Sequence, residues 1–186
     1  MGYTFLSSQT ASTSSSIDFT SGIDGTYNEY LFTIVNYKPV TDEQRLGWQT
    51  DVGTATTYGQ TITSTAFSAL NVQSGTWEIL EYDAAHDQAQ GTALQSLGYT
   101  GESNTYAPMT SSGQLTLYDP SNGTYVKHFT SRLNGQYTGN NTDAQTYSFD
   151  SYRAGYVNTT TALTRVRFAA LSGNIYTGIF TLYGVG

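Results

Sequence analysis

Apolar and polar residues alternate along most of the chain, and a period of two is the pattern of a half-buried β-strand. The stretch YNEYLFTIV, for example, places Tyr30, Phe32 and Ile34 on one face. No segment keeps a helical period for more than about two turns. The chain contains 16 tyrosines and 8 phenylalanines among many threonines, and aromatic and β-branched residues favour a pleated strand surface. The pattern predicts strands throughout.

About ten short strands are expected at this spacing. Turn-forming residues separate them, including Asp119-Pro120, Asn134-Gly135 and Ser172-Gly173-Asn174. The expected strands are residues 3–6, 27–35, 45–51, 60–67, 77–82, 114–118, 124–133, 145–149, 152–157, 163–170 and 178–183. The last two are expected to form a terminal hairpin, and residues 83–99 an irregular loop.

The number of strands, their turns and the absence of an internal repeat predict an all-β fold, an antiparallel β-sandwich of the jelly-roll kind. The length of 186 residues suits one domain spanning residues 1–186. Within it, residues 1–16 are expected to form a loop or an extended arm, because the run TASTSSS is low in complexity. Trp48 and Trp77 fall on alternating strands, where a core position is the common outcome.

Charge is scarce: charged residues make up 11% of the chain, against about a quarter in an average domain. A surface of Thr, Ser, Asn, Gln and Tyr loses little side-chain entropy when it is covered, so it suits permanent packing against other molecules. The net charge of −7 argues against a nucleic-acid partner, and no stretch is long and apolar enough to predict a membrane span. Five basic residues fall in the last third: Lys127, Arg132, Arg153, Arg165 and Arg167. Pairing with an acidic neighbour is one interpretation, and solvated strand faces are the preferred one.

Few residues are candidates for catalysis. The chain has no cysteine, and its only imidazoles are His86 and His128, the second of which alternates like a strand residue. The stretch EYDAAHDQ carries Glu81, Asp83, His86 and Asp87, which could gather around a cation. It lacks the glycine and the alternating acids of a calcium loop, so a solvated acidic loop is the preferred interpretation. We predict no metal, no cofactor and no catalytic residue.

Three stretches carry a family resemblance: residues 14–44, 82–98 and 154–186. Together they resemble a family of short virion-associated structural proteins, tail proteins among them, of tailed phages of marine and other aquatic bacteria, including cyanophages. The resemblance spans nearly the whole chain and implies a structural role in the particle, with no catalytic residue to carry over. Tyr176 and Thr177 stand where the family tends to have an acidic and a small residue, so no ion contact is carried over there.

The expected function is that of a non-enzymatic structural protein of a tailed bacteriophage virion, made in the host cytoplasm and associated with the tail, baseplate or fibre. The alternatives are a decoration protein on the outer capsid surface, a carbohydrate-binding receptor adhesin that contacts host glycan, and a small glycan hydrolase. Expected partners are copies of the chain itself, a trimer being one arrangement, and other virion proteins. Exposed aromatics are over-represented at interfaces, so the expected interface residues are Tyr99, Tyr106, Tyr137 and Tyr176, unless they cover the sandwich ends.

Overall fold

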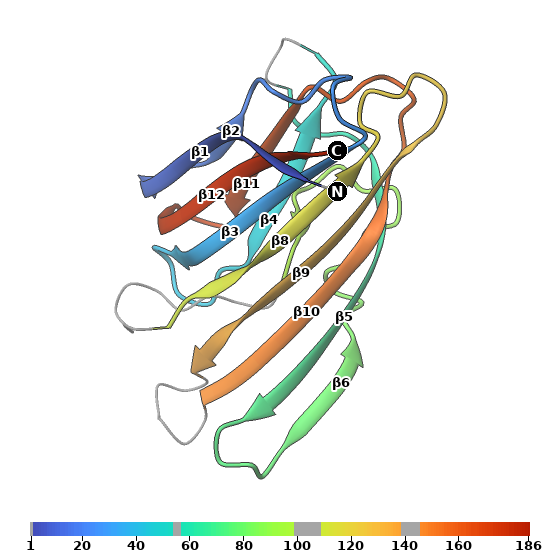
Figure 1. Ribbon diagram of the computed structural model, residues 1–186. Helices are drawn as coiled ribbons and strands as arrows, with labels where there is room; N and C mark the ends of the chain where they lie inside the picture. The colour runs from blue at the N-terminus through green and yellow to red at the C-terminus, as the bar shows by residue number, and fades with distance from the viewer. Residues whose placement is uncertain (1, 54–56, 99–108, 139–145) are drawn as a thin grey trace.

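The computed structural model of the chain is an all-β sandwich of twelve strands in two antiparallel sheets (Figure 1). It describes residues 2–53, 57–98, 109–138 and 146–186. These residues contain no helix, and therefore none with the length and apolar character needed to cross a membrane. The all-β antiparallel sandwich predicted from the alternation is confirmed.

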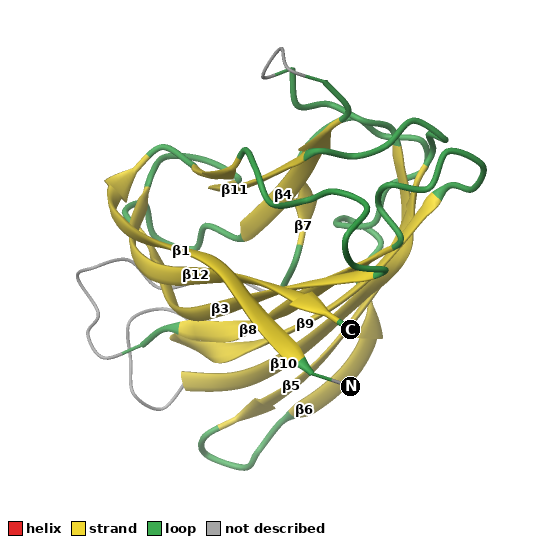
Figure 2. Cartoon of the chain, turned by 45° about the horizontal axis from the view of Figure 1, so that its top comes forward, coloured by secondary structure: helices red, strands yellow, loops and turns green. Residues whose placement is uncertain are grey.

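The larger sheet has eight strands and the smaller sheet has four. In spatial order, the larger sheet comprises β1 (Tyr3–Ser14), β12 (Ile175–Val185), β3 (Glu29–Pro39), β8 (Ser111–Tyr118), β9 (Lys127–Thr138), β10 (Thr146–Val157), β5 (Ile62–Val72) and β6 (Glu78–Tyr82). The smaller sheet comprises β2 (Ile17–Phe19), β11 (Arg165–Ala170), β4 (Leu46–Asp51) and β7 (Gln95–Ser96). Figure 2 shows the smaller sheet lying over one part of the larger sheet, with β5 and β6 at the far end.

The strand order is that of a jelly roll with two inserted hairpins. If β5, β6, β9 and β10 are set aside, the remaining eight strands, renumbered along the chain, lie in the orders 1-8-3-6 and 2-7-4-5. Each sheet thus alternates strands from the two halves of the chain, as in a jelly roll. The hairpins β5–β6 and β9–β10 are added to the larger sheet beside β8 and extend it beyond the smaller sheet. We call these four strands the extension.

The core between the two sheets is built from aromatic rings. Phe168 of β11 contacts Phe19, Phe32 and Phe180, with ring centroids 6.2, 5.5 and 5.4 Å away. All four rings are buried. Burying such large apolar side chains is the main favourable term in folding, so this cluster holds the two sheets together.

The prediction for β3 is confirmed, because Tyr30, Phe32 and Ile34 are all buried. Trp48 is also in the core, as expected. The core position expected for Trp77 is wrong. It precedes β6 at the edge of the extension and is 45% exposed, since the smaller sheet does not reach that far.

The N-terminal segment differs from its expected form. The run TASTSSS was expected to be a loop or an arm, yet most of it belongs to β1, which pairs with β12 from Tyr3 opposite Val185 to Ser14 opposite Ile175. In an edge strand, small polar residues can occupy both faces. Only Ala11 of β1 is buried, so the strand shows almost no apolar alternation.

One predicted turn and one expected break between strands are also wrong. Asn134-Gly135 lies within β9, where Gly135 is required because a Cβ there would sit 2.5 Å from Ser111 Oγ and 2.7 Å from the Phe149 ring. The segment between residues 149 and 152 continues as one strand, β10. The predicted terminal hairpin does not form either, since β11 and β12 belong to different sheets and residues 171–174 cross between them.

Candidate functional site

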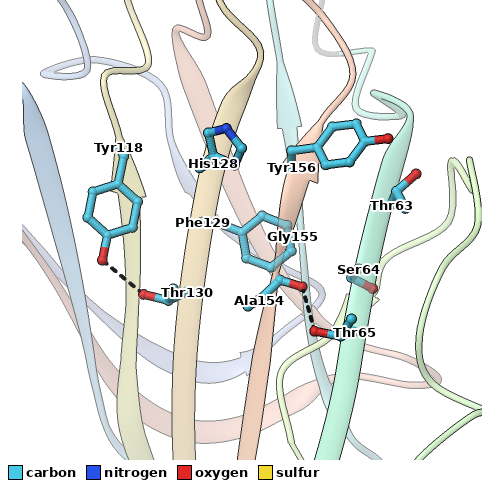
Figure 3. A pocket seen from close by; sticks show the side chains of 10 residues that line it. All are labelled: Thr63, Ser64, Thr65, Tyr118, His128, Phe129, Thr130, Ala154, Gly155 and Tyr156. Carbon is cyan, nitrogen blue, oxygen red and sulfur yellow. Dashed lines mark hydrogen bonds between the residues drawn. The ribbon is translucent and has the colours of Figure 1, made fainter.

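The face of the larger sheet that points away from the smaller sheet, here called the outer face, carries a shallow trough across the extension (Figure 3). The trough encloses about 390 Å³. Thr130 of β9, Ala154 of β10 and Thr65 of β5 are directly opposite one another and form its floor. Their side chains are small, so the floor lies below the neighbouring rows of larger residues.

One wall of the trough is formed by Tyr118, His128 and Tyr156, which lie on three adjacent strands (Figure 3). The Tyr118 hydroxyl is 3.1 Å from Thr130 Oγ1, and the His128 and Tyr156 rings meet edge to face at 6.3 Å. His128 is an exposed strand residue, as predicted. Neither of its ring nitrogens hydrogen-bonds to another residue in the described part of the chain, so both are free to meet a ligand.

A ladder of stacked planar groups lies on the other side of the floor, two residues further along each strand. Phe67 and Tyr152 stack with centroids 4.9 Å apart and planes 10° apart, and the Arg132 guanidinium lies 5.2 Å from the centre of the Tyr152 ring. We call Arg132, Tyr152 and Phe67 the aromatic ladder. Antiparallel register places them directly opposite one another, so the stack is a consequence of strand pairing.

Asp150 holds the aromatic ladder in place through hydrogen bonds. Its carboxylate accepts hydrogen bonds from Arg132 Nη2 at 2.6 Å, Arg132 Nε at 2.9 Å and the Tyr152 hydroxyl at 2.9 Å. The hydrogen bonds from Arg132 are the main reason that the pKa of Asp150 lies below its ordinary value. The ladder is therefore held in one geometry before any partner arrives.

The chemistry of the trough suits a neutral ligand. Its ten lining residues, all within the described part of the chain, include aromatic rings, hydroxyls and one imidazole, but no carboxylic acid. Rings with hydroxyl handles can pack against C–H groups and hydrogen-bond at the same time. Glycoside hydrolysis needs two carboxyl groups at the bond to be cleaved, and this lining supplies none. The lining therefore offers groups that suit contact with a neutral ligand and holds no carboxyl pair of the kind that most glycosidases use.

A second group of interacting polar side chains, built around an ion pair, lies beneath the extension. Asp83 Oδ2 lies 2.9 Å from both Arg45 Nη1 and Arg153 Nη2, and Asp83 Oδ1 lies 2.7 Å from His86 Nδ1. We call these four residues the Asp83 cluster. The Arg153 side chain is completely buried, and its burial lowers the pKa of the guanidinium to about 10. The arginine therefore stays charged at neutral pH and must be neutralised by Asp83.

Opposing effects determine the ionisation of Asp83. Burial acts to raise the pKa of its carboxyl, but the hydrogen bond with His86 and the charges of Arg45 and Arg153 outweigh burial and hold the pKa below its ordinary value. The carboxylate is thus ionised and fully engaged by neighbours. Buried charges in such a network stabilise a fold only while every partner is present.

The interpretation of EYDAAHDQ as a solvated acidic loop is wrong for Asp83. The structure does bring Asp83 and His86 together, but two arginines occupy the place that a cation would take. Asp87 lies apart and accepts a hydrogen bond from the Tyr82 hydroxyl at 2.6 Å. Within the described residues, no group of three or more histidine and acidic side chains is arranged to hold a metal ion.

Two of the basic residues expected on solvated strand faces are buried instead: Arg153 and Lys127. The Lys127 ammonium donates hydrogen bonds to the main-chain carbonyl oxygens of Asn122, Tyr125 and Thr160. These carbonyls belong to loops, so the alternation of the strand gave no sign of them. Arg132 is exposed as predicted.

The structure describes two of the four predicted interface tyrosines, Tyr137 and Tyr176. Tyr99 and Tyr106 lie outside the described residues. Tyr137, near the end of β9, stacks on Tyr147 at 5.7 Å and donates a hydrogen bond to Glu43 Oε1 at 3.1 Å. Tyr176 lies on β12 and is 40% exposed. Sequence reasoning missed the aromatic ladder, although aromatic residues at the outward positions of two expected strands were a usable signal.

Comparison with known proteins adds no relative: no protein-family model matches the chain, and a search of curated proteins finds no significant match. The function of the outer face therefore has to be inferred from its own chemistry.

Proposed function

We propose that the protein is a non-enzymatic structural component of a tailed bacteriophage virion, associated with the tail, baseplate or fibre, and that it acts by presenting a preformed neutral surface. The observation that carries this proposal is the separation of charged from neutral chemistry. The charges of the Asp83 cluster are mostly buried and pair with one another, whereas the trough on the outer face is lined by aromatic rings, hydroxyls and one imidazole, and the Arg132–Asp150 ion pair beside it is paired within the chain. Rigid surfaces of that kind suit contact with other proteins.

The family resemblance supports a role in the particle. Residues 14–44, 82–98 and 154–186 contain β2, β3, β7, β11 and β12, all of which belong to the jelly-roll strands. Most of the extension lies between these stretches. The resembling stretches thus supply five of the eight jelly-roll strands.

The proposed partners are further copies of the chain and other virion proteins. With 11% charged residues, the surface has few long flexible side chains to immobilise on assembly. A decoration role on the outer capsid would use the same chemistry, so the place of the protein in the particle distinguishes the two.

The test is quantitative mass spectrometry of gradient-purified virions encoding this chain, followed by separation of tails from heads. We expect a fixed copy number relative to the major capsid protein and recovery with the tails. Recovery with the heads would favour the decoration role. The proposal would be contradicted if the chain were present in the infected-cell lysate but were lost from the purified particles, as a host cytoplasmic protein is.

The trough favours a second candidate function, a receptor adhesin that binds a neutral host glycan. Its rings and hydroxyls, with an imidazole free to hydrogen-bond, are the groups that a pyranose would contact. The test is titration of the intact chain with host surface polysaccharide. Tyr156→Ala should weaken binding by about tenfold or more, whereas Tyr125→Ala, at a 68% exposed position that does not line the trough, should not. Equal binding by both variants would reject the trough as the site.

A further inference from the structure

The larger sheet ends at β6. Within the described residues, no further strand pairs with the free edge of β6. Two of its five residues project large apolar groups: Leu80 is 74% exposed and Tyr82 is 54% exposed. An open strand edge presents unpaired N–H and C=O groups that another strand can use. Of the common protections of such edges, β6 lacks proline, lysine and a bulge, while its two glutamates, Glu78 and Glu81, are charges that any pairing strand has to accommodate.

The hydrogen bonds that flank β6 show which of its main-chain groups face the open side. Val72 N donates to Trp77 O at 3.0 Å. Asp83 N donates to Ala66 O at 2.8 Å. Because main-chain groups of an antiparallel strand alternate in direction, odd-numbered residues of β6 bond to β5 and even-numbered ones point outward. The outward-pointing residues are Glu78, Leu80 and Tyr82.

We propose that β6 pairs with β6 of a second copy, antiparallel about a twofold axis at Leu80, and joins the two larger sheets into one. This inference rests on the proposed function, since it identifies the surface through which copies of the chain assemble. A twofold axis makes the contact self-complementary, so one strand supplies both halves of the interface.

The charges on β6 select this register. With Leu80 opposite Leu80 of the second copy, Glu78 faces Tyr82 and Ile79 faces Glu81, so no two carboxylates are opposite. A twofold register centred on Glu78 or Glu81 would place two like charges face to face, which is destabilising. A register centred on Ile79 would leave the outward-pointing main-chain N–H and C=O groups of Tyr82 without a partner in the second β6. Only the Leu80 register uses all three outward-pointing residues.

The same register covers exposed apolar surface. Leu80 would pack against its own counterpart across the axis. On the outer face, Tyr82 is directly opposite Phe67 of the aromatic ladder, so the row of planar groups would continue up to the joint. Because the axis of an antiparallel strand pair is perpendicular to the sheet, both troughs would open on the same side of the dimer.

Sedimentation equilibrium of the full chain tests the pairing. The native chain should form dimers, and Leu80→Lys and Leu80→Glu should each weaken dimerisation by about tenfold or more, because each places two like charges opposite one another. An equimolar mixture of the two variants should recover a one-to-one heterodimer. That recovery is specific to a register in which residue 80 faces itself, and it shows that both variants are folded.

Ile179→Lys is the matched control, since Ile179 is 44% exposed on a strand inside the sheet and should leave dimerisation unchanged. A native chain that stays monomeric at about 1 mM would overturn the inference. So would dimers that neither Leu80 variant weakens, or variants that do not recombine. Virion recovery tests the proposed function separately, because a chain can be found in the particle without pairing through β6.

Discussion

Beneath the smaller sheet the larger sheet buries a cluster of aromatic rings, whereas the extension buries serines and an ion cluster alongside its own apolar residues, such as Phe129 and Leu133. Phe168 and its neighbours fill the first region. In the second, Ser68 Oγ lies 2.9 Å from Ser151 Oγ, and Ser64 Oγ donates to Gln95 Oε1 at 2.6 Å. The smaller sheet covers the first region with apolar side chains, while polar groups from the loop after β6, from β7 and from Arg45 close the second region.

The difference shows two ways of closing an interior. Apolar packing is non-directional, so its contribution follows the area buried and tolerates small adjustments. A polar interior depends on each donor finding its acceptor, because an orphaned buried group costs more than a hydrogen bond contributes. The extension should therefore be sensitive to charge and hydrogen-bonding changes, and the jelly-roll part to changes of volume.

Phe168→Ala should give the largest loss, about 3–5 kcal/mol in the free energy of unfolding, because it opens a cavity among three other rings. Urea titration followed by fluorescence measures it. Phe67→Ala, which removes the same ring from a 42% exposed position, should cost about 1 kcal/mol. Similar losses in the two variants would mean that the aromatic core does not dominate stability.

Asp83→Asn should destabilise the extension by about 3 kcal/mol, because it leaves Arg153 buried without a counter-charge. The same urea titration serves, with Asp87→Asn as the control, since Asp87 lies outside the cluster and should change stability by about 0.5 kcal/mol or less. If the two variants were equally stable, the Asp83 cluster would not be holding the extension.

Lowering the pH should reduce the free energy of unfolding more for the native chain than for the Asp83→Asn variant. The pKa of Asp83 is lower in the folded chain than its ordinary value, so its contribution is fully present above about pH 4 and is lost as the pH falls through the folded-state pKa. Unfolding free energies measured from neutral pH downward should therefore fall more steeply for the native chain. Asp150, whose pKa is also lowered, preserves part of the slope in the variant. Parallel curves would contradict this assignment.

Arg132→Ala should have the smallest effect on stability. Its ion pair with Asp150 is on the outer face, with side chains 61% and 24% exposed, where water and salt screen the attraction. The urea midpoint should stay within experimental scatter of the native value at both low and high salt. A loss as large as that of Asp83→Asn would mean that the ladder supports the fold as well as the surface.

A strand can be predicted well from the sequence where one of its faces is apolar, and poorly where both faces are polar. β3 was predictable because Tyr30, Phe32 and Ile34 alternate with less buried residues. β1 was not, because serine and threonine occur on both of its faces. Gly135 resembled a turn residue, and the close approach of Ser111 and the Phe149 ring explains it as a strand residue.

The candidate sites were harder to predict, since they depend on long-range pairing. Asp83 is separated by 38 residues from Arg45 and by 70 from Arg153, so the local motif contained only His86 among its partners. The trough depends on the register of β9, β10 and β5, which the two inserted hairpins determine. Alternation could place Thr65, Thr130 and Ala154 on a face, but not opposite one another.

The pairing of β1 with β12 constrains how the chain folds. Tyr3 lies opposite Val185, so this ladder can close only after nearly the whole chain has been drawn together. Folds dominated by such distant contacts reach the native state slowly, over milliseconds to seconds. Within the described sheet β1 pairs with β12 alone, so the amides of β1 can gain protection from hydrogen exchange only once β12 is in place beside it.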